Sequence, residues 1–369
     1  MNSDYYGSLD FSDVMMNYSD ATSNFSESYT GFTCESSLDE DLQEHEKHNK
    51  LYLVVIPFLY SLVFVVGAMG NSLVLFILMR KHRSRSSTDN FLLHLAIADL
   101  LMLVTFPFTI TEAIVGWKFG DFLCKLVGAI SRLNFYCSSL LLGCISIDRY
   151  LSIIYAIHTF KNRSIRTIHF YCSYVWIVCF LLSLPNMFIL GTHQLHNYTW
   201  CTYHQNYFPS NIWWQIGRFI NHSVGFLLPM IIMIICYSRI IATLCRSPRR
   251  EKKKAVRVAL VITGVFFLCW TPFNVAVFLD TLDQYGLIKS CSVKNNLPIT
   301  ITVTELFGYL HSCLNPLLYA FVGAKFRNDA LKVLKHFGCF KPEMFGHSTS
   351  VSRKSSTTDS EIQTVISSI

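Results

Sequence analysis

The stretch LYLVVIPFLYSLVFVVGAMGNSLVLFILM, residues 51–79, carries no charged side chain. A helix needs about 20 mostly apolar residues to cross the roughly 30 Å of bilayer hydrocarbon, so this stretch predicts a membrane-spanning helix. Six further stretches are long, apolar and nearly free of charge: residues 91–115, 122–147, 167–190, 219–238, 258–279 and 297–324. The sequence therefore predicts an all-α membrane protein, a bundle of seven transmembrane helices.

The composition agrees with a polytopic membrane protein. Charged residues make up 15% of the 369, against roughly 25% in an average soluble protein, and hydrophobic residues make up 51%, with a mean hydropathy of +0.36. These values exclude a disordered, collagen-like or ordinary cytosolic chain. The net charge of +7 does not call for a nucleic-acid partner, because the basic residues can be cytoplasmic membrane anchors.

The basic residues fall into four clusters, which follow the first, third, fifth and seventh spans: 80–85, 149–166, 239–257 and 325–354. Lys and Arg concentrate in cytoplasmic loops, so all four clusters are expected inside the cell. The N-terminus is then extracellular, and residues 1–50 hold eleven acidic residues against two lysines. We expect a multi-pass protein of the cell membrane without a cleavable signal peptide.

Four segments are expected along the chain. Residues 1–50 form a disordered acidic N-terminus, 51–324 the bundle, 325–340 an amphipathic eighth helix on the cytoplasmic face, and 341–369 a disordered tail with 12 Ser or Thr in 29 residues. The expected glycosylation sites are Asn17, Asn24 and Asn197, and the expected phosphorylation sites are Ser355, Ser356, Thr357 and Thr358. Cys339 is either a palmitoylation site or a free cytoplasmic thiol.

Four of the 13 cysteines lie on the extracellular side: Cys34, Cys124, Cys201 and Cys291. They allow three pairings. We predict Cys124–Cys201, which joins the top of the third span to the second outer loop, and Cys34–Cys291, which would hold the acidic segment over the mouth of the bundle. The sequence has no CxxC and no Cys/His zinc spacing, so no structural metal is expected.

Polar residues inside the spans mark candidate functional sites, because ionisable groups in a membrane are costly. Asp99 lies in the middle of the second span, and Ser138, Asn315 and Asn71 lie at comparable positions in other spans. This set could hold a sodium ion or a protonated carboxyl. The alternative is a structural polar core without a ligand.

Three short motifs indicate a conformational switch. Asp148-Arg149-Tyr150 ends the third span at the cytoplasm, where the arginine could exchange partners or simply snorkel. Trp270 lies beside Pro272, which should kink the sixth span. Asn315-Pro316-Leu-Leu-Tyr319 ends the seventh span. Singly each motif is weak, but in this order on these spans they are very specific.

With these motifs, residues 50–340 resemble the rhodopsin-like G-protein-coupled receptors. Further matching positions are Gly70-Asn71, Leu95–Asp99, Trp176, and Pro229 with Tyr237. Narrower features resemble the CXC chemokine receptors: Thr105-Phe-Pro107, DRYLSIIYA at 148–156, and HSCLNP at 311–316. Ser152 and Ile154-Tyr155 depart from that family's usual pattern at the G-protein surface.

The resemblance implies a CXC chemokine as ligand. Tyr5, Tyr6 and Tyr18 lie in the acidic N-terminus, where the family often sulfates tyrosines, and unmodified tyrosines are the alternative. Glu112, Asp280 and Glu305 lie near the outer ends of three spans and could receive the ligand's N-terminal amine. Glu305 is the first candidate, and its alternative role is an internal salt bridge to Arg132.

The resemblance also implies coupling to an inhibitory-class heterotrimeric G protein, followed by receptor kinases and arrestin. Its outputs would be calcium signalling and chemotaxis. The switch residues would be Asp148, Arg149, Tyr150, Tyr237, Trp270, Pro272, Asn315, Pro316 and Tyr319. The main rival is a scavenging chemokine receptor without G-protein coupling. A transporter and a membrane enzyme are disfavoured, because we find neither repeated halves nor a catalytic motif.

Overall fold

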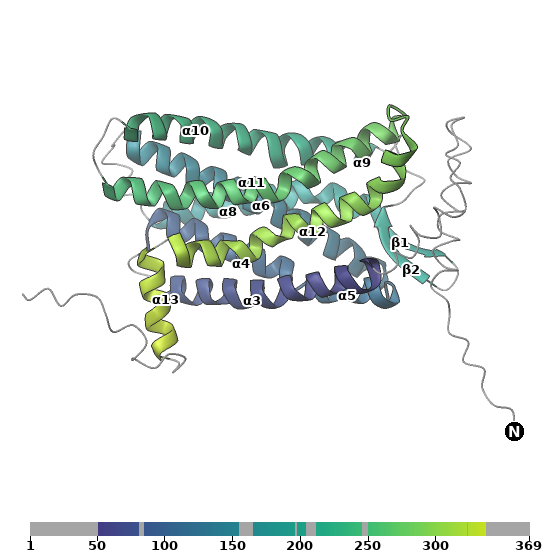
Figure 1. The fold of residues 1–369 in the computed structure, drawn as a ribbon, viewed down its shortest axis with the longest axis horizontal. Helices are drawn as coiled ribbons and strands as arrows, with labels where there is room; N and C mark the ends of the chain where they lie inside the picture. The colour runs from purple at the N-terminus through teal and green to yellow at the C-terminus, as the bar shows by residue number, and fades with distance from the viewer. Residues whose placement is uncertain are drawn as a thin grey trace, which may run out of the picture.

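The computed structural model describes residues 51–80, 85–154, 165–195, 198–203, 212–245, 250–322 and 324–336. Long helices lie side by side in one bundle, and a short helix crosses one end of it (Figure 1). The spans, in chain order, are α3 (Ile56–Arg80, preceded by the π-turn Leu51–Val55), α4 (Ser87–Leu103) with α5 (Phe106–Val115), α6 (Gly120–Ile154), α8 (Ile165–Ile189), α9 (Ile212–Ile220) with the π-helical segment η4 (Asn221–Leu227) and α10 (Leu228–Cys245), α11 (Arg250–Gln284), and α12 (Cys291–Val322).

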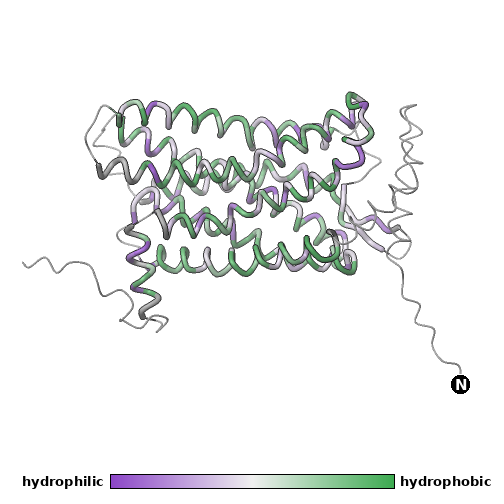
Figure 2. Tube along the Cα trace, in the orientation of Figure 1, coloured by the Kyte–Doolittle hydropathy of each residue, from purple (hydrophilic) through white to green (hydrophobic). Residues whose placement is uncertain are grey.

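Six of these spans are long and apolar enough, by length and composition, to cross a membrane. The seventh, α12, is as long, but its buried polar residues His311, Ser312 and Asn315 lower its hydropathy. Many large apolar side chains are exposed, and Phe58, Phe170 and Phe219 are each about two-thirds exposed or more. Hydrophobic residues predominate along the long helices (Figure 2). An apolar exterior around buried polar groups fits a bundle whose solvent is lipid, so the predicted seven-helix membrane fold is confirmed.

The second span is broken, as its Thr105-Phe-Pro107 sequence suggests. The helix α4 ends at Leu103, and α5 restarts at Phe106. Pro107 has no N–H to continue the ladder, and the Thr105 hydroxyl donates to the Met102 carbonyl at 2.6 Å across the break. The break redirects the outer end of this span, α5, which carries Glu112.

The second outer loop forms a β-hairpin that the all-α prediction omitted. Strands β1 (Leu190–Leu195) and β2 (Tyr198–Tyr203) pair antiparallel, with Thr192 opposite Cys201. A two-residue connection and strand-forming residues such as Tyr198, Thr199 and Trp200 were the available signals. The hairpin lies at the end of the bundle where α5 ends and α6 begins (Figure 1).

The short helix α13 (Ala324–His336) confirms the amphipathic eighth helix. Its buried residues Ala330 and Val333 pack with Ile77 of α3, while Arg327, Leu331 and Lys332 are exposed. It runs across the end of the bundle away from the hairpin (Figure 1). This placement is typical of a helix that lies in the plane of a membrane surface.

Candidate functional site

The hairpin covers the outer end of the bundle and is held there covalently. Cys124 at the start of α6 and Cys201 in β2 form a disulfide with 5.5 Å between their Cα atoms, as predicted. The Trp117 amide donates to the Thr199 carbonyl at 2.7 Å. The hairpin therefore forms a fixed cover over this end of the bundle.

Glu112 of α5 holds this wall with both side chain and backbone. Its Oε1 accepts the Cys201 amide at 2.6 Å, and its carbonyl accepts the Tyr198 hydroxyl at 2.6 Å. Burial, together with the nearby Glu112 carboxylate, raises the pKa of Tyr198 to about 12, so this hydroxyl stays protonated as a donor. Glu112 thus has a positioning role that the sequence did not reveal.

Glu305 of α12 is half-buried and accepts the Tyr309 hydroxyl at 3.0 Å. The alternative partner, Arg132, donates to the Tyr203 hydroxyl at 3.0 Å, lies over the Phe273 ring at 5.4 Å and is within electrostatic range of Glu305. No ion pair to Glu305 is found within the described ranges. Glu305 is therefore a carboxylate in a partly dry site that a ligand cation could approach.

Asp280 of α11 differs from the other two carboxylates, because Arg218 of α9 neutralises it. The Arg218 guanidinium forms an ion pair with the Asp280 carboxylate and donates to the Val277 carbonyl at 3.0 Å. Glu112 and Glu305 both lie within electrostatic range of the Tyr60 hydroxyl. The structure thus brings Glu112 and Glu305 toward one region, while Asp280 clamps α9 to α11. The sequence reasoning did not identify Arg218.

Trp270 lies at the centre of the bundle, almost fully buried. Its indole Nε1 and His311 Nδ1 are 3.2 Å apart, and its ring lies 4.7 Å from the Phe135 ring and 5.6 Å from the Tyr309 ring, between centroids. A Cβ added at Gly308 would lie 2.8 Å from the indole Cε3. Because these neighbours leave the indole no free space, movement of α11 requires Trp270 to repack.

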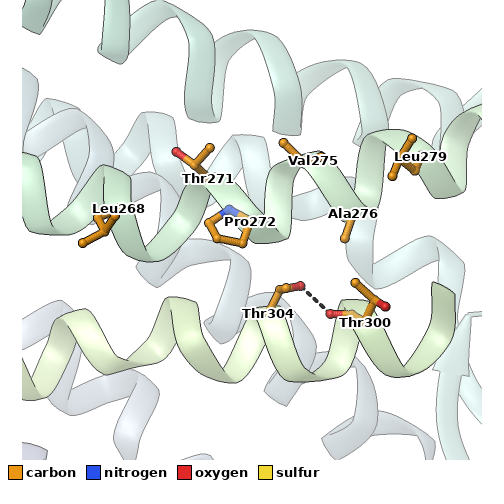
Figure 3. Close-up of a pocket in the computed structure, with 8 residues that line it drawn as sticks. All are labelled: Leu268, Thr271, Pro272, Val275, Ala276, Leu279, Thr300 and Thr304. Atoms are coloured by element: carbon orange, nitrogen blue, oxygen red, sulfur yellow. Dashed lines mark hydrogen bonds between the residues drawn. The ribbon is translucent and has the colours of Figure 1, made fainter. Parts of the chain in front are cut away.

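Around Pro272, next but one to Trp270 in the chain, a groove lies between α11 and α12 on the surface of the bundle (Figure 3). The groove has a volume of about 520 Å³ and no charged lining residue; it is lined by Leu268, Thr271, Pro272, Val275, Ala276, Leu279, Thr300 and Thr304. Its threonine hydroxyls donate to carbonyls of their own helices. Pro272 removes the hydrogen bond to the Leu268 carbonyl, which weakens the helix where it would bend.

Asp99 of α4 links three spans, because its carboxylate accepts hydrogen bonds from side chains of α6 and α12. Its Oδ1 accepts from Asn134 Nδ2 of α6 and Ser312 Oγ of α12, each at 3.0 Å, and its Oδ2 accepts from Asn315 Nδ2 at 3.1 Å. His311 Nε2 lies 3.5 Å from Oδ1. The predicted cluster around Asp99 and Asn315 is therefore present, although Asn134, Ser312 and His311 were not among its expected members.

Three buried oxygens of α3 and α6 have no hydrogen-bond partner within the described ranges. Ser138 Oγ, Asn71 Oδ1 and Asn134 Oδ1 are all buried in this way. Asn71 Nδ2 donates to the Ser312 carbonyl at 2.8 Å, which links α3 to the cluster. Unpaired buried oxygens are unusual in proteins, and this donor set suits water or a small hard cation. No group of three or more His, Cys, Asp and Glu in the part searched could hold a metal.

Further switch residues lie toward the end of the bundle that α13 crosses. The Tyr237 hydroxyl of α10 lies 3.4 Å from Thr263 Oγ1 of α11 and within electrostatic range of Arg149. The Tyr319 ring contacts the Phe326 ring of α13 at 5.9 Å. Tyr237 therefore connects α10 to α6 and α11, and Tyr319 connects α12 to α13.

Some predicted positions lie outside the described residues: Tyr5, Tyr6, Asn17, Tyr18, Asn24, Cys34, Asn197, Cys339, Ser355, Ser356, Thr357 and Thr358. Cys291, at the start of α12, is disulfide-bonded. Its predicted partner Cys34 is in that undescribed set, so the Cys34–Cys291 pairing stays a prediction.

Residues 70–319 match the family model "7 transmembrane receptor (rhodopsin family)". The chain is 44% identical to human C-X-C chemokine receptor type 5 over 84% of each sequence, and equally similar to the mouse protein of that name. It is 41% identical to bovine C-X-C chemokine receptor type 3 over 82% of each. The chain belongs to the rhodopsin family of seven-transmembrane receptors and, within it, to the C-X-C chemokine receptors.

These similarities agree with the receptor type that three short segments of the sequence resemble. Residues 134–142, 266–270 and 278–282 resemble type 5 most, with type 3 next, and the overall identities follow the same order. The chain is a receptor and not an enzyme.

Proposed function

We propose that this chain binds a CXC chemokine outside the cell and activates an inhibitory-class heterotrimeric G protein, which drives calcium signalling and chemotaxis. The chain is more similar to type 5 receptors than to type 3 receptors, which favours a role in the homing of B cells over a role in the leukocytes that a type 3 receptor would serve. The N-terminus is extracellular in this proposal, because the basic clusters lie on the opposite side of the membrane.

The observation that carries the proposal is a continuous line of contacts along the bundle. It starts at Glu305, which accepts the Tyr309 hydroxyl, and the Tyr309 ring packs on Trp270. Trp270 contacts His311, which contacts Asp99 at 3.5 Å. Asp99 accepts from Asn315 of the Asn-Pro motif that ends α12. A ligand cation at Glu305 can thus alter packing as far as the cytoplasmic half.

Chemokine capture would take place in two steps. Residues 1–50 have nine more acidic residues than lysines, so they attract a basic ligand at long range, and sulfation of Tyr5, Tyr6 or Tyr18 would add to this charge. The ligand's flexible N-terminus then enters the outer cavity between the hairpin and α12. Its amine pairs with Glu305, while Glu112 keeps the hairpin in place.

Activation would favour one of two bundle conformations. A ligand shifts the equilibrium between these conformations only if its affinity for the two differs. The helix α11 would pivot at Trp270 and Pro272. Outward movement of the cytoplasmic end of α11 would separate Thr263 from Tyr237 and expose Arg149 to the G protein. Phosphorylation of Ser355, Ser356, Thr357 and Thr358 would then recruit arrestin.

The cluster around Asp99 would bind a sodium ion as an allosteric regulator. Asp99, Ser138 and Asn315 would hold it, and the unpaired Ser138 Oγ and Asn71 Oδ1 support this assignment. The ion supplies a positive charge that offsets the Asp99 carboxylate. His311 lies on the same carboxylate oxygen, so a protonated imidazole would compete for that site.

The substitution Arg149→Ala tests the signalling half of the proposal. Chemokine binding should persist, because Arg149 lies at the far end of the bundle, while G-protein activation should be lost. The scavenging alternative predicts instead that wild type and Arg149→Ala both internalise chemokine without activating G protein. Ile147→Val on the same helix, at an exposed side chain outside the switch motifs, serves as a matched control for surface expression.

A further inference from the structure

A polar network runs from the hairpin to α11 through side chains that are not part of the line of contacts described above. Arg132 of α6 donates to the Tyr203 hydroxyl of β2 at 3.0 Å and to Asn221 Oδ1 of η4 at 3.4 Å. Asn221 Nδ2 donates to Asn274 Oδ1 of α11 at 3.2 Å, and Asn274 Nδ2 donates to the Trp270 carbonyl at 2.9 Å. We call the four side chains the outer polar network: Tyr203, Arg132, Asn221 and Asn274.

The two asparagines of this network, Asn221 and Asn274, depend on each other. They are only 5% and 4% exposed, and both polar atoms of each side chain are hydrogen-bonded. A buried amide that loses its partner still carries the full cost of its desolvation. Inside a membrane protein no bulk water can replace that partner. Removal of either asparagine therefore leaves a polar atom of the other unpaired.

The segment η4, which begins at Asn221, is fixed to α6. The Ser139 hydroxyl of α6 donates to the Gly225 carbonyl of η4 at 2.7 Å. A Cβ added at Gly225 would lie 2.6 Å from a ring carbon of Phe135, so the η4 backbone rests directly on α6. The π-helical backbone of η4 is a departure from the α-helix that is common at functional sites. Asn221 therefore moves with α6, and its bond to Asn274 is the point at which the network crosses to α11.

We propose that the outer polar network stabilises the resting conformation of the receptor and that its bond to α11 breaks on activation. Asn274 lies two residues after Pro272, on the outer side of the kink at which α11 would pivot. Its bond to the Trp270 carbonyl lies within α11 and can survive a movement of that helix. Its bond to Asn221 joins α11 to a different segment, so this bond must change when α11 moves relative to η4.

The network also connects to the proposed ligand site. Arg132 lies within electrostatic range of Glu305, so a ligand amine bound at Glu305 would repel the guanidinium and weaken its hydrogen bond to Asn221. A ligand that displaces the hairpin would act on the same guanidinium through Tyr203. The response to ligand therefore rests on the proposed function, whereas the effect on α11 is a property of the ligand-free receptor.

The size of the effect follows from the bond between Asn221 and Asn274. A contact shifts the equilibrium between two conformations only if it differs between them. A neutral hydrogen bond that is present in the resting conformation alone favours that conformation about fivefold. In the resting conformation the Tyr237 hydroxyl lies 3.4 Å from Thr263 Oγ1, across α10 and α11. Loss of the network should therefore raise the ratio of molecules with α10 and α11 separated to resting molecules about fivefold.

The first test is basal activation of an inhibitory-class G protein, without ligand, in cells that display the full-length receptor in measured amounts. Asn221→Leu and Asn274→Leu should each raise basal activation about fivefold, and the double variant should raise it no further, because the same bond is lost in all three. Asn221→Asp keeps the size of the side chain and its acceptor for Arg132 but removes the donor to Asn274, so it should also raise basal activation. Asn296→Leu is the matched control, because Asn296 donates to the Ser292 carbonyl of its own helix, and it should leave basal activation unchanged.

The second test measures the position of α11 and depends neither on the ligand nor on the G protein. Nitroxide labels on two exposed positions, Cys245 at the end of α10 and Arg257→Cys near the start of α11, report the distance between these helices by double electron–electron resonance in nanodiscs. Cys339→Ser prevents a further label. Asn221→Leu should increase the ratio of the longer to the shorter distance about fivefold, and Asn296→Leu should not change it.

The inference fails if Asn221→Leu and Asn274→Leu lower the Tm of the receptor but change neither basal activation nor the distance, since the network then stabilises only the fold. It also fails if the double variant shows the product of the two single effects, about 25-fold, since the two asparagines then act independently. Equal activation by Asn296→Leu would likewise contradict it. If no chemokine activates the wild-type receptor and the distance still shifts as expected, the network stands and the proposed function fails.

Discussion

Substitution of Gly308 by alanine should displace Trp270. The new Cβ would lie 2.8 and 2.9 Å from two carbons of the buried indole. Carbon atoms in contact normally lie about 3.5–4.0 Å apart, so the indole must move by roughly 0.7 Å or more. It has no free direction, because the Phe135, Phe273 and Tyr309 rings surround it with centroids 4.7, 5.5 and 5.6 Å away.

The size of the effect follows from two opposing contributions. Overpacking a well-filled core costs about 1–3 kcal/mol, while replacing glycine by alanine inside a helix gains about 0.5–1 kcal/mol. The free energy of unfolding of Gly308→Ala should therefore fall by up to about 2.5 kcal/mol relative to wild type, and it should lie about 1–3 kcal/mol below that of a helix Gly→Ala change that causes no clash. Gly264→Ala on α11 is the matched control, because a Cβ there would meet nothing within 4 Å, and only the helix-propensity gain applies.

Thermal unfolding of the purified receptor, followed with a thiol-reactive fluorophore, measures both variants. The buried thiols Cys137, Cys172 and Cys179 become reactive only when the bundle opens. At about 2–4 °C per kcal/mol, the Tm of Gly308→Ala should lie about 2–12 °C below that of Gly264→Ala, and the Tm of Gly264→Ala should not fall below that of wild type. A Gly308→Ala receptor as stable as the Gly264→Ala control would refute the tight packing of Trp270 against α12.

Three further predictions concern ligand, ion and charge. Glu305→Gln should lower the potency of G-protein activation about 10–100-fold, which corresponds to the loss of a hydrogen bond to a charged group of about 1.5–3 kcal/mol. Chemokine affinity should change much less. Equal losses of potency and affinity would contradict the two-step mechanism of capture. The affinity of the wild-type receptor for its agonist should be lower in sodium buffer than in choline buffer at the same ionic strength. Asp99→Asn should abolish this difference in affinity. A difference that survives the substitution would place the sodium ion at another site. Chemokine association should slow steeply with added salt, because the acidic residues 1–50 steer a basic ligand, and a flat salt response measured by surface plasmon resonance would exclude steering.

The elements predicted best were those fixed by local sequence. Uncharged stretches placed the spans, and the motifs Asp148–Tyr150 and Asn315–Tyr319 lie in the last turns of α6 and α12. The observed helices are longer than the predicted spans: α6 continues to Ile154 and α11 begins at Arg250. The prediction counted only the apolar residues within the hydrocarbon, whereas helices extend through the polar interface where charged residues are tolerated.

The polar core was predicted in part. Asp99 and Asn315 stood out because charged or amide groups in a membrane are costly. Asn134, His311 and Ser312 could not be assigned to the same site, because the contacts depend on how α4, α6 and α12 rotate and pack against one another. Which side chains meet across helices depends on tertiary packing, and the pattern of residue types along one sequence does not reveal it.

The outer surface was predicted least well. The β-hairpin was missed because its strands are short and follow directly from a long apolar helix. Arg218 was not recognised as the partner of Asp280, since 62 residues separate them in the chain. The family resemblance had ranked Glu305 first among the three carboxylates, but the roles of Asp280 and Glu112 became visible only through their partners in the structure.

The central claim is that this chain is a signalling receptor for a CXC chemokine. Its most direct test is inhibitory-class G-protein activation in cells that display the chain, across a panel of CXC and CC chemokines, with Arg149→Ala in parallel. The account predicts a response to one or two CXC ligands that Arg149→Ala abolishes. Silence across the whole panel, despite surface display and chemokine uptake, would contradict it and favour a scavenging receptor.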